Sequence, residues 1–430
     1  MNILDGYNAV ETENADETEN TPIEEGPSLA LFYLLGNGSL LPYNIFLNSI
    51  DLLNKYCDSK KMGMSINRTY SFTFSITSII FSLFQPKNPL PFFIIGFVIL
   101  TSITIAYPIL LVVGIGKSTL SILTKIFFYV IGFASSIAFS SARKLVFIFG
   151  HSSYSFLTGS YGCFAVVAVS LRISTKSAFL DDSQIVMSSL CYYFLSAVLL
   201  LVFYVYYLIN LCSSRMKNRF KKVSGIEYAP FISRESINIL FEKWPFYLAE
   251  LTNTFITTSL FPGYLTYVKE SPDIGDWTPV IVTSVFCIFN LVGESFAMRI
   301  DSQLRYLDLV IAFCRSISYP LFIPSIENIF HLGEPVWTFC WSILFGLSNG
   351  LVKTHVLLCA FREPSMELAS TNSSGPESNE STENNINSVE TGVSHGITNN
   401  IRNLIDFWMT FSTTTGSISG VFMSFAFRDR

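Results

Sequence analysis

Apolar residues along this chain are gathered into long continuous runs that are separated by polar segments. The runs fall at about eleven places: 29–50, 69–86, 91–113, 121–149, 156–174, 186–210, 240–266, 278–298, 306–326, 335–361 and 403–427. An α-helix of about 20 apolar residues crosses about 30 Å of hydrocarbon and satisfies its own backbone hydrogen bonds there. Barrel strands would instead alternate apolar and polar residues over short segments. The pattern therefore predicts an all-α polytopic membrane protein with about eleven transmembrane helices.

The composition agrees with a membrane protein and excludes several other classes. Half of the 430 residues are hydrophobic, only 14% are charged, and the mean hydropathy is +0.45. The net charge of −5 reflects eight acidic residues among the first 28 positions, so it does not indicate nucleic acid as a partner. The cysteines and histidines lack metal-ligand spacing, and no catalytic or phosphate-binding motif is present. We therefore expect no enzyme activity, no metal and no cofactor, and we expect His355 to be a hydrogen-bonded packing residue.

A basic segment between the sixth and seventh runs sets the expected topology. It spans 211–239, and clusters of Lys and Arg of this kind stay in the cytoplasm. Counting outward places the N-terminus in the cytoplasm and the C-terminus outside the cell, with six helices in 27–210 and five in 240–428. Residues 1–26 are acidic, 362–400 are polar, and both segments are predicted to be disordered and cytoplasmic. The six-plus-five division predicts a two-bundle transporter that resembles the major facilitator architecture.

Two kinds of short motif add local expectations. Of the glycosylation sequons in polar segments, only the one that begins at Asn67 would face the outside in this topology, so Asn67 is the glycosylation candidate. The GxxxG spacings at 346–350 and 416–420 let helices approach closely, and both are predicted to be sites of helix packing.

Several ionisable side chains fall inside the apolar runs, where a charge costs roughly 2.5–3.5 kcal/mol on insertion scales. They are Arg143, Lys144, Arg172, Lys176, Glu250, Glu294, Arg315 and Lys353. Arg143 and Lys144, near the inner end of the fourth run, are expected to be topology anchors. Arg172 and Lys176 share one face of the fifth run near its outer end, and a structural or gating role is expected for them.

Glu294 and Lys353 lie deepest in their runs, and each has an asparagine one helical turn before it. Asn290 precedes Glu294, and Asn349 precedes Lys353. Opposite charges on two helices predict an interhelical pair. Two interpretations stay open: a salt bridge that only fixes the bundle, or a site for a ligand with sugar hydroxyls and a planar base, because carboxylates accept from hydroxyls and aromatic faces stack on bases.

Five short motifs, in order along the chain, resemble the equilibrative nucleoside transporter family. The segment 36–44, GNGSLLPYN, is similar to the family's GxGTLLPWN, and 171–176, LRISTK, is similar to its LRxxTK. LFPG at 260–263 and FGLSNG at 345–350 match its FP and FxxSNG elements, and 416–427 resembles its closing GxxxGxxFSF pattern. The resemblance implies eleven helices and facilitative transport of nucleosides, with nucleobases as further substrates, by alternating access in the plasma membrane.

The eighth run departs from the family pattern FNxxDxxGR. Aligned on Gly293, this chain has Asn290 at the family's Asp position and Glu294 at its Arg position, so both charges change. We expect Lys353 to supply the compensating cation and Tyr161 to stand at the family's glutamine position in the fifth helix. The residues expected to bind substrate are Leu40, Tyr43, Asn44, Tyr161, Phe261, Asn290, Glu294, Asn349 and Lys353.

Other functions stay open at this point. The altered eighth helix also fits a carrier of a different polar solute. A proton-coupled carrier of nucleosides or nucleobases is a second alternative, in which Glu294 would carry the proton. The alternative from another class is a membrane receptor that binds a small polar ligand without transporting it.

Overall fold

The computed structural model describes residues 29–57, 62–84, 88–147, 161–179, 184–211, 233–262, 277–300, 306–327, 335–361 and 383–426, together with 86, 157, 213 and 275. Within these residues the chain is helical and contains no strand. Six of the helices are long and apolar enough to cross a membrane. The prediction of an all-α polytopic membrane protein is therefore confirmed, and the number of eleven spans stays a prediction.

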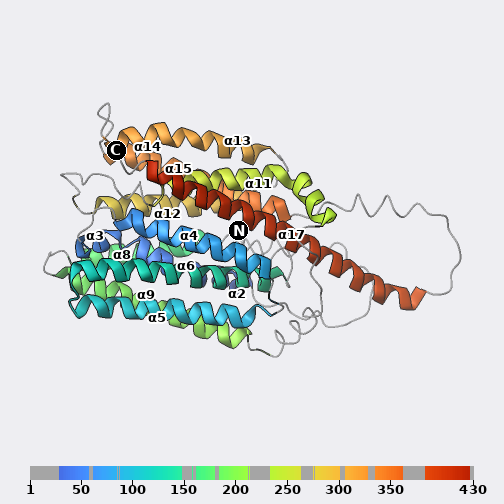
Figure 1. Ribbon diagram of the computed structural model, residues 1–430, viewed down its shortest axis with the longest axis horizontal. Coiled ribbons are helices and arrows are strands. Elements are labelled where there is room, and N and C mark those ends of the chain that lie inside the picture. The colour runs from blue at the N-terminus through green and yellow to red at the C-terminus, as the bar shows by residue number, and fades with distance from the viewer. Residues whose placement is uncertain are drawn as a thin grey trace, which may run out of the picture.

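The first half of the chain forms helices that follow one another up and down the molecule. They are α2 (Leu29–Leu47), α3 (Ile50–Tyr56), α4 (Met62–Phe84), α5 (Leu90–Val112), α6 (Lys117–Phe147), α8 (Tyr161–Ala178) and α9 (Ile185–Leu211). They lie side by side with nearly parallel axes (Figure 1). Aromatic residues fill the space between them: Phe46 contacts the rings of Tyr107, Phe128 and Tyr193.

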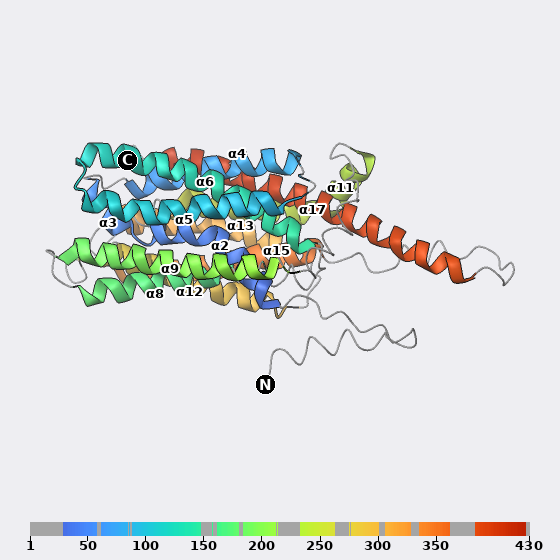
Figure 2. The same cartoon turned by 90° about the horizontal axis from the view of Figure 1, so that it is seen from below.

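The second half of the chain forms a second group of helices against the first. They are α11 (Arg234–Leu260), α12 (Thr278–Ala297), α13 (Leu307–Cys314), the 3-10 turn η3 (Arg315–Ile317), α14 (Ser318–Glu327), α15 (Pro335–Phe361) and α17 (Glu383–Ala426). Across the two halves α4 packs on α17 and α8 packs on α12. The end of α17 that begins at Glu383 extends well beyond the other helices (Figure 2).

The observed helices correct two of the sequence-based boundaries. The segment 362–400 is predicted to be disordered, but α17 already begins at Glu383. Extending a helix costs less than starting one, so the apolar end of α17 continues through a polar stretch that contains no proline. Likewise α11 begins at Arg234 and not at 240, because the hydroxyl of Ser233 caps it by accepting the backbone N–H of Ser236.

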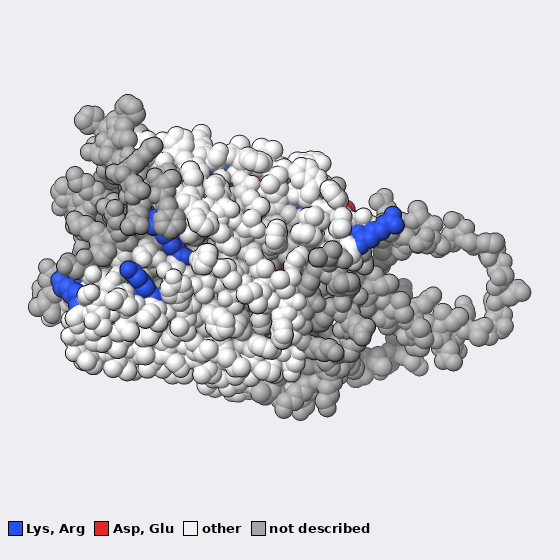
Figure 3. All heavy atoms as spheres, in the orientation of Figure 1, with Lys and Arg blue, Asp and Glu red and all other residues white. Residues whose placement is uncertain are grey.

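The outer surface of the helices is apolar, as a lipid-facing surface must be. Large side chains such as Ile80, Val112, Phe194 and Ile209 are more than half exposed. Among the described residues on the face in Figure 3, charged side chains gather near the two ends of the molecule and are sparse between them. Exposed apolar surface on this scale marks contact with a membrane.

The predicted packing role of both GxxxG segments is confirmed. On α15 a Cβ at Gly350 would lie 2.0 Å from the backbone oxygen of Asn290, and one at Gly346 would lie 2.5 Å from that of Phe286. On α17 a Cβ at Gly416 would lie 2.4 Å from the backbone oxygen of Leu251 on α11. Glycine therefore lets α15 touch the backbone of α12, which brings the polar residues of these two helices together.

Candidate binding cavity

A cavity of about 280 Å³ lies between the two halves of the chain. Its wall is made by α2, α4 and α6 of the first half and by α11, α12, α15 and α17 of the second, with Ala165 from α8. Small-molecule sites have volumes of roughly 300–1,000 Å³, so the cavity is close to the lower end of this range and suits a small metabolite.

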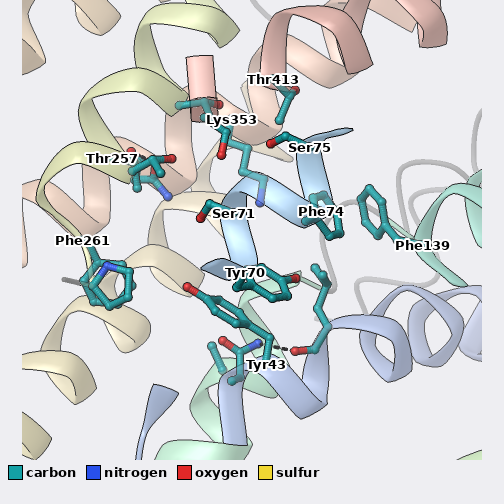
Figure 4. Close-up of a pocket in the computed structure, with 18 of the residues that line it drawn as sticks. Tyr43, Tyr70, Ser71, Phe74, Ser75, Phe139, Thr257, Phe261, Lys353 and Thr413 are labelled. Carbon is teal, nitrogen blue, oxygen red and sulfur yellow. Dashed lines mark hydrogen bonds between the residues drawn. The ribbon is translucent and has the colours of Figure 1, made fainter. Parts of the chain in front are cut away.

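Most of the residues expected to bind substrate surround this cavity. Those in its wall are Leu40, Tyr43, Asn44, Phe261, Asn290, Glu294, Asn349 and Lys353. Tyr161 is the first residue of α8, and its side chain lies outside the described part of the chain. Figure 4 shows Tyr43, Phe261 and Lys353 approaching the cavity from three different sides.

Aromatic side chains supply two stacked pairs in the wall. The rings of Tyr43 and Tyr70 lie 3.8 Å apart and nearly parallel, at 13°. Phe261 and Phe286 are also stacked, with centroids 3.8 Å apart and planes at 23°. Tyr70 on α4 was missed by the sequence analysis, because one tyrosine in a chain with 15% aromatic residues carries no signal. The two pairs give the cavity flat apolar surfaces on separate walls.

Glu294 is fully buried, and each of its carboxylate oxygens accepts a hydrogen bond. Oε1 accepts from the side-chain amide of Asn290 at 2.8 Å, and Oε2 accepts from the backbone N–H of Gly162 at 2.8 Å. Gly162 is in the first turn of α8, where backbone N–H groups have no partner within the helix. Glu294 therefore links α12 of the second half to the beginning of α8 in the first half.

The amides around Glu294 form a continuous chain of hydrogen bonds into the second half. Asn349 donates to the side-chain oxygen of Asn290 at 2.7 Å and accepts from Asn253 at 3.3 Å. The guanidinium of Arg315 in turn donates to the side chain of Asn253 and, at 3.1 Å, to the hydroxyl of Ser348. This chain connects α12, α15, α11 and η3, and it orients the two asparagines that the sequence singled out.

Lys353 lines the same cavity as two carboxylates. The predicted pair of Lys353 with Glu294 stays a prediction, and both side chains are in the cavity wall. Glu250 of α11, which the sequence analysis noted as an ionisable residue but did not assign to the site, is in this wall too. The wall thus holds one lysine and two acidic side chains from three different helices.

Arg143, which is expected to be a topology anchor, forms a buried contact between the two halves of the chain. Its guanidinium is 2.9 Å from the Asp406 carboxylate of α17 and donates to the hydroxyl of Thr410 at 2.7 Å. Both charged side chains are less than a tenth exposed. The sequence did not indicate this contact, because α17 approaches α6 only in the folded protein and offers a buried carboxylate there. The pair joins the two halves at one end of the cavity.

Arg172 and Lys176 both bind the carboxylate of Asp51 on α3. The Arg172 guanidinium is fully buried against this carboxylate, and the Lys176 ammonium lies 3.1 Å from it. The same ammonium lies 5.0 Å from the ring centre of Trp277, which precedes α12. Lys176 therefore ties α3 and α8 to the beginning of α12 in the second half, whereas Arg172 binds residues of the first half, namely Asp51, Ser188 and Tyr192. Asp51 was missed because its run of sequence read as a loop.

The predicted glycosylation of Asn67 is contradicted by its position. Asn67 lies inside α4, only 4% of it is exposed, and its side-chain oxygen accepts hydrogen bonds from the hydroxyls of Tyr43 at 3.1 Å and Ser71 at 3.3 Å. A glycan on this amide would have no room. The sequon lies within a helix because α4 begins at Met62, seven residues before the apolar run that predicted it.

A separate polar cluster joins α13 and α15 outside the cavity wall. The ring nitrogen Nδ1 of His355 lies 2.9 Å from both carboxylate oxygens of Asp308, and the sulfur of Cys359 lies 3.6–3.7 Å from the ring. Their ligand atoms all lie within 4.8 Å of one another, so this is the group among the described residues that could hold a metal ion. The predicted packing role of His355 agrees with its bond to Asp308.

Comparison with known proteins supports the resemblance that the five motifs indicated. No protein-family model matches the chain. It is similar to the human "Equilibrative nucleoside transporter 4" (31% identity) and to the protein of that name in Danio rerio (28%), each over 110 residues. It is also similar to the "Equilibrative nucleotide transporter 1" of Arabidopsis thaliana, with 26% identity over 105 residues. The chain thus resembles the equilibrative nucleoside transporter family.

The matched part of the chain is short in every case. It covers 24–25% of this chain and spans between 20% and 23% of the length of these relatives. The proteins it resembles are transporters by name.

Proposed function

We propose that this protein is a facilitative transporter of nucleosides. The observation that carries the proposal is a cavity between two helical halves that combines aromatic surfaces with buried hydrogen-bonding groups. The similarity of part of the chain to proteins named as equilibrative nucleoside transporters supports the same function.

The chemistry of the wall suits the two parts of a nucleoside. The base would pack on the flat surfaces of Tyr43 and Phe261, because apolar ring faces stack on planar heterocycles. The ribose hydroxyls would reach Asn290 and Glu294, since a carboxylate accepts hydrogen bonds and an amide both donates and accepts. Nucleobases, which keep the planar part, would be further substrates.

The charges of the wall favour a nucleoside over a nucleotide. The charged side chains in it are Arg143, Glu250, Glu294 and Lys353, and the guanidinium of Arg143 is already paired with Asp406. Phosphate groups are bound by clusters of Arg and Lys that outnumber the acids. Since the described wall has no such excess of positive charge, we expect substrates without a phosphate group.

Transport would proceed by alternating access between the two halves. In the conformation described, contacts between the halves include Arg143 with Asp406, Glu294 with the backbone of Gly162, and the packing of α4 on α17. Rocking of one half against the other would break some of these contacts and open the cavity to one side of the membrane. The bound substrate would cross without a cofactor.

The test is uptake of radiolabelled adenosine by cells that lack their own nucleoside carriers. The native chain is compared with Glu294→Gln at matched surface expression. Glutamine keeps one oxygen but turns an NH₂ group toward either Asn290 or Gly162, so two donors would face each other. Such a mismatch costs about 1–3 kcal/mol, so we expect uptake to fall about tenfold or more.

Glu242→Gln is the matched control, because Glu242 is exposed on α11 and lies outside the cavity wall. We expect it to leave uptake unchanged. Normal uptake by Glu294→Gln would make Glu294 a structural residue only. Saturable adenosine binding without counterflow by the native chain would identify a receptor and overturn the transport proposal.

A proton-coupled carrier is the second candidate function, and the presence of two buried carboxylates in the wall favours it. The same uptake assay distinguishes the two mechanisms. Facilitative transport predicts adenosine uptake that a protonophore leaves unchanged. Uptake that collapses with the proton gradient would replace the facilitative mechanism.

A further inference from the structure

Glu250 is a buried carboxylate in the cavity wall, and only one of its two oxygens accepts hydrogen bonds from the described residues. It lies in the middle of α11 and is 2% exposed. Its Oε1 accepts from the hydroxyls of Thr254 and Thr413, each at 3.0 Å. Its Oε2 is buried and has no hydrogen-bond partner among the described residues. Because a buried acceptor without a donor is costly, this oxygen is where a ligand would gain most by donating.

Glu294, the second carboxylate of the cavity, differs from Glu250 in its hydrogen-bond partners. Both oxygens of Glu294 already accept from protein donors, namely Asn290 and the backbone of Gly162. Oε2 of Glu250 is therefore the carboxylate oxygen of the described wall that accepts from no protein donor and would gain most from a ligand donor, while each oxygen of Glu294 can still accept a second hydrogen bond. The hydroxyls of Thr254 on α11 and Thr413 on α17 fix the orientation of the Glu250 carboxylate.

The position of Glu250 suits the edge of a base. Thr413, which binds it, lies across the cavity from Tyr43 in Figure 4, so the wall with Glu250 faces the aromatic stack. Lys353 of α15 lines the same cavity as Glu250, and its ammonium carries three N–H donors. Glu250 and Lys353 together thus offer an acceptor beside a donor. Bases present the complementary pattern, for example an amino group beside a ring nitrogen in adenine.

We infer that Glu250 is a specificity-determining residue that accepts a hydrogen bond from the N–H edge of the base. This inference rests on the proposed nucleoside transport and assigns a second recognition contact in the cavity. The ribose binds near Glu294, and the base binds at Glu250. Substrates whose base carries a hydrogen-bond donor are selected over those whose base has none.

The experiment compares adenosine with purine riboside, which has the same ribose and ring system but no donor on its base. For each nucleoside we would measure the concentration that half-maximally raises the melting temperature of the purified protein. The native protein is expected to prefer adenosine by about tenfold or more, because a site built around a hydrogen bond rejects the analogue that lacks it. Glu250→Gln is expected to abolish this preference.

The reason lies in the two threonines. They donate to one oxygen of residue 250, so a glutamine would keep its oxygen toward Thr254 and Thr413 and turn its NH₂ toward the base. Adenosine would then meet donor against donor, whereas purine riboside would lose nothing. Glu242→Gln, the same change on an exposed part of α11, is the control and should keep the native preference.

Glu250→Asp covers the case in which Glu250→Gln does not fold. It keeps the charge but withdraws the carboxylate by one methylene, and it should also reduce the preference for adenosine. An unchanged preference in a folded variant would overturn the role of Glu250 and leave the transport proposal intact. Native protein that neither takes up adenosine nor is stabilised by any nucleoside would overturn both.

Discussion

Gly350→Ala is the sharpest test of how this protein holds its polar residues in place. A Cβ at position 350 would lie 2.0 Å from the backbone oxygen of Asn290 and 2.8 Å from the backbone nitrogen of Glu294. Real Cβ atoms keep at least 3.0 Å from other heavy atoms. Neither contact atom is in a flexible side chain, so α12 and α15 themselves must move apart by roughly 1 Å.

The expected loss of stability follows from the effect of this movement on the neighbouring residue, Asn349. Asn349 donates to Asn290 at 2.7 Å, and an added separation of about 1 Å takes this distance to roughly 3.7 Å, beyond hydrogen bonding. Overpacking costs about 1–3 kcal/mol, and leaving a buried amide unsatisfied costs about as much again. We therefore expect a loss of roughly 2–6 kcal/mol and a melting temperature that falls by about 5 °C or more.

The assay is the melting temperature of the detergent-purified protein, with adenosine uptake measured in parallel. Gly116→Ala is the matched control, since a Cβ at Gly116 would meet no atom within 4 Å. The control should have the same melting temperature as the native protein. If Gly350→Ala also melts with the native protein, the close contact of α12 and α15 does not exist, and the reasoning about Asn349 and Asn290 fails with it.

Two further predictions concern the contacts between the halves. Gly162→Ala would place a Cβ 2.6 Å from Oε2 of Glu294, so we expect adenosine uptake to fall about tenfold; normal uptake would mean that this contact is absent or irrelevant. Asp406→Asn would leave the Arg143 guanidinium buried without its counterion, a change that typically costs about 3–5 kcal/mol and should lower the melting temperature. Adding Arg143→Met should recover part of the loss, and strictly additive losses in the double variant would show that the two side chains do not interact.

The sequence by itself was sufficient for the class of fold and for much of the candidate site. Runs of apolar residues cannot be hidden in a chain that crosses lipid, so the helices lie close to where the pattern predicts them. A charge in such a run is costly, which is why Glu294 and Lys353 stood out without any structure. The short motifs around Tyr43, Phe261 and Asn349 pointed to three further residues of the cavity wall.

The tertiary structure alone decided which side chains face one another. Lipid makes every span apolar on its outer face and leaves little periodicity that says which helices are neighbours. Hence the partners from distant segments could not be read from the chain: Asp406 for Arg143, Asp51 for Arg172, and Tyr70 for Tyr43. Glu250 was visible as a buried charge, but its unpartnered oxygen and its place in the cavity exist only once α11, α15 and α17 have packed together.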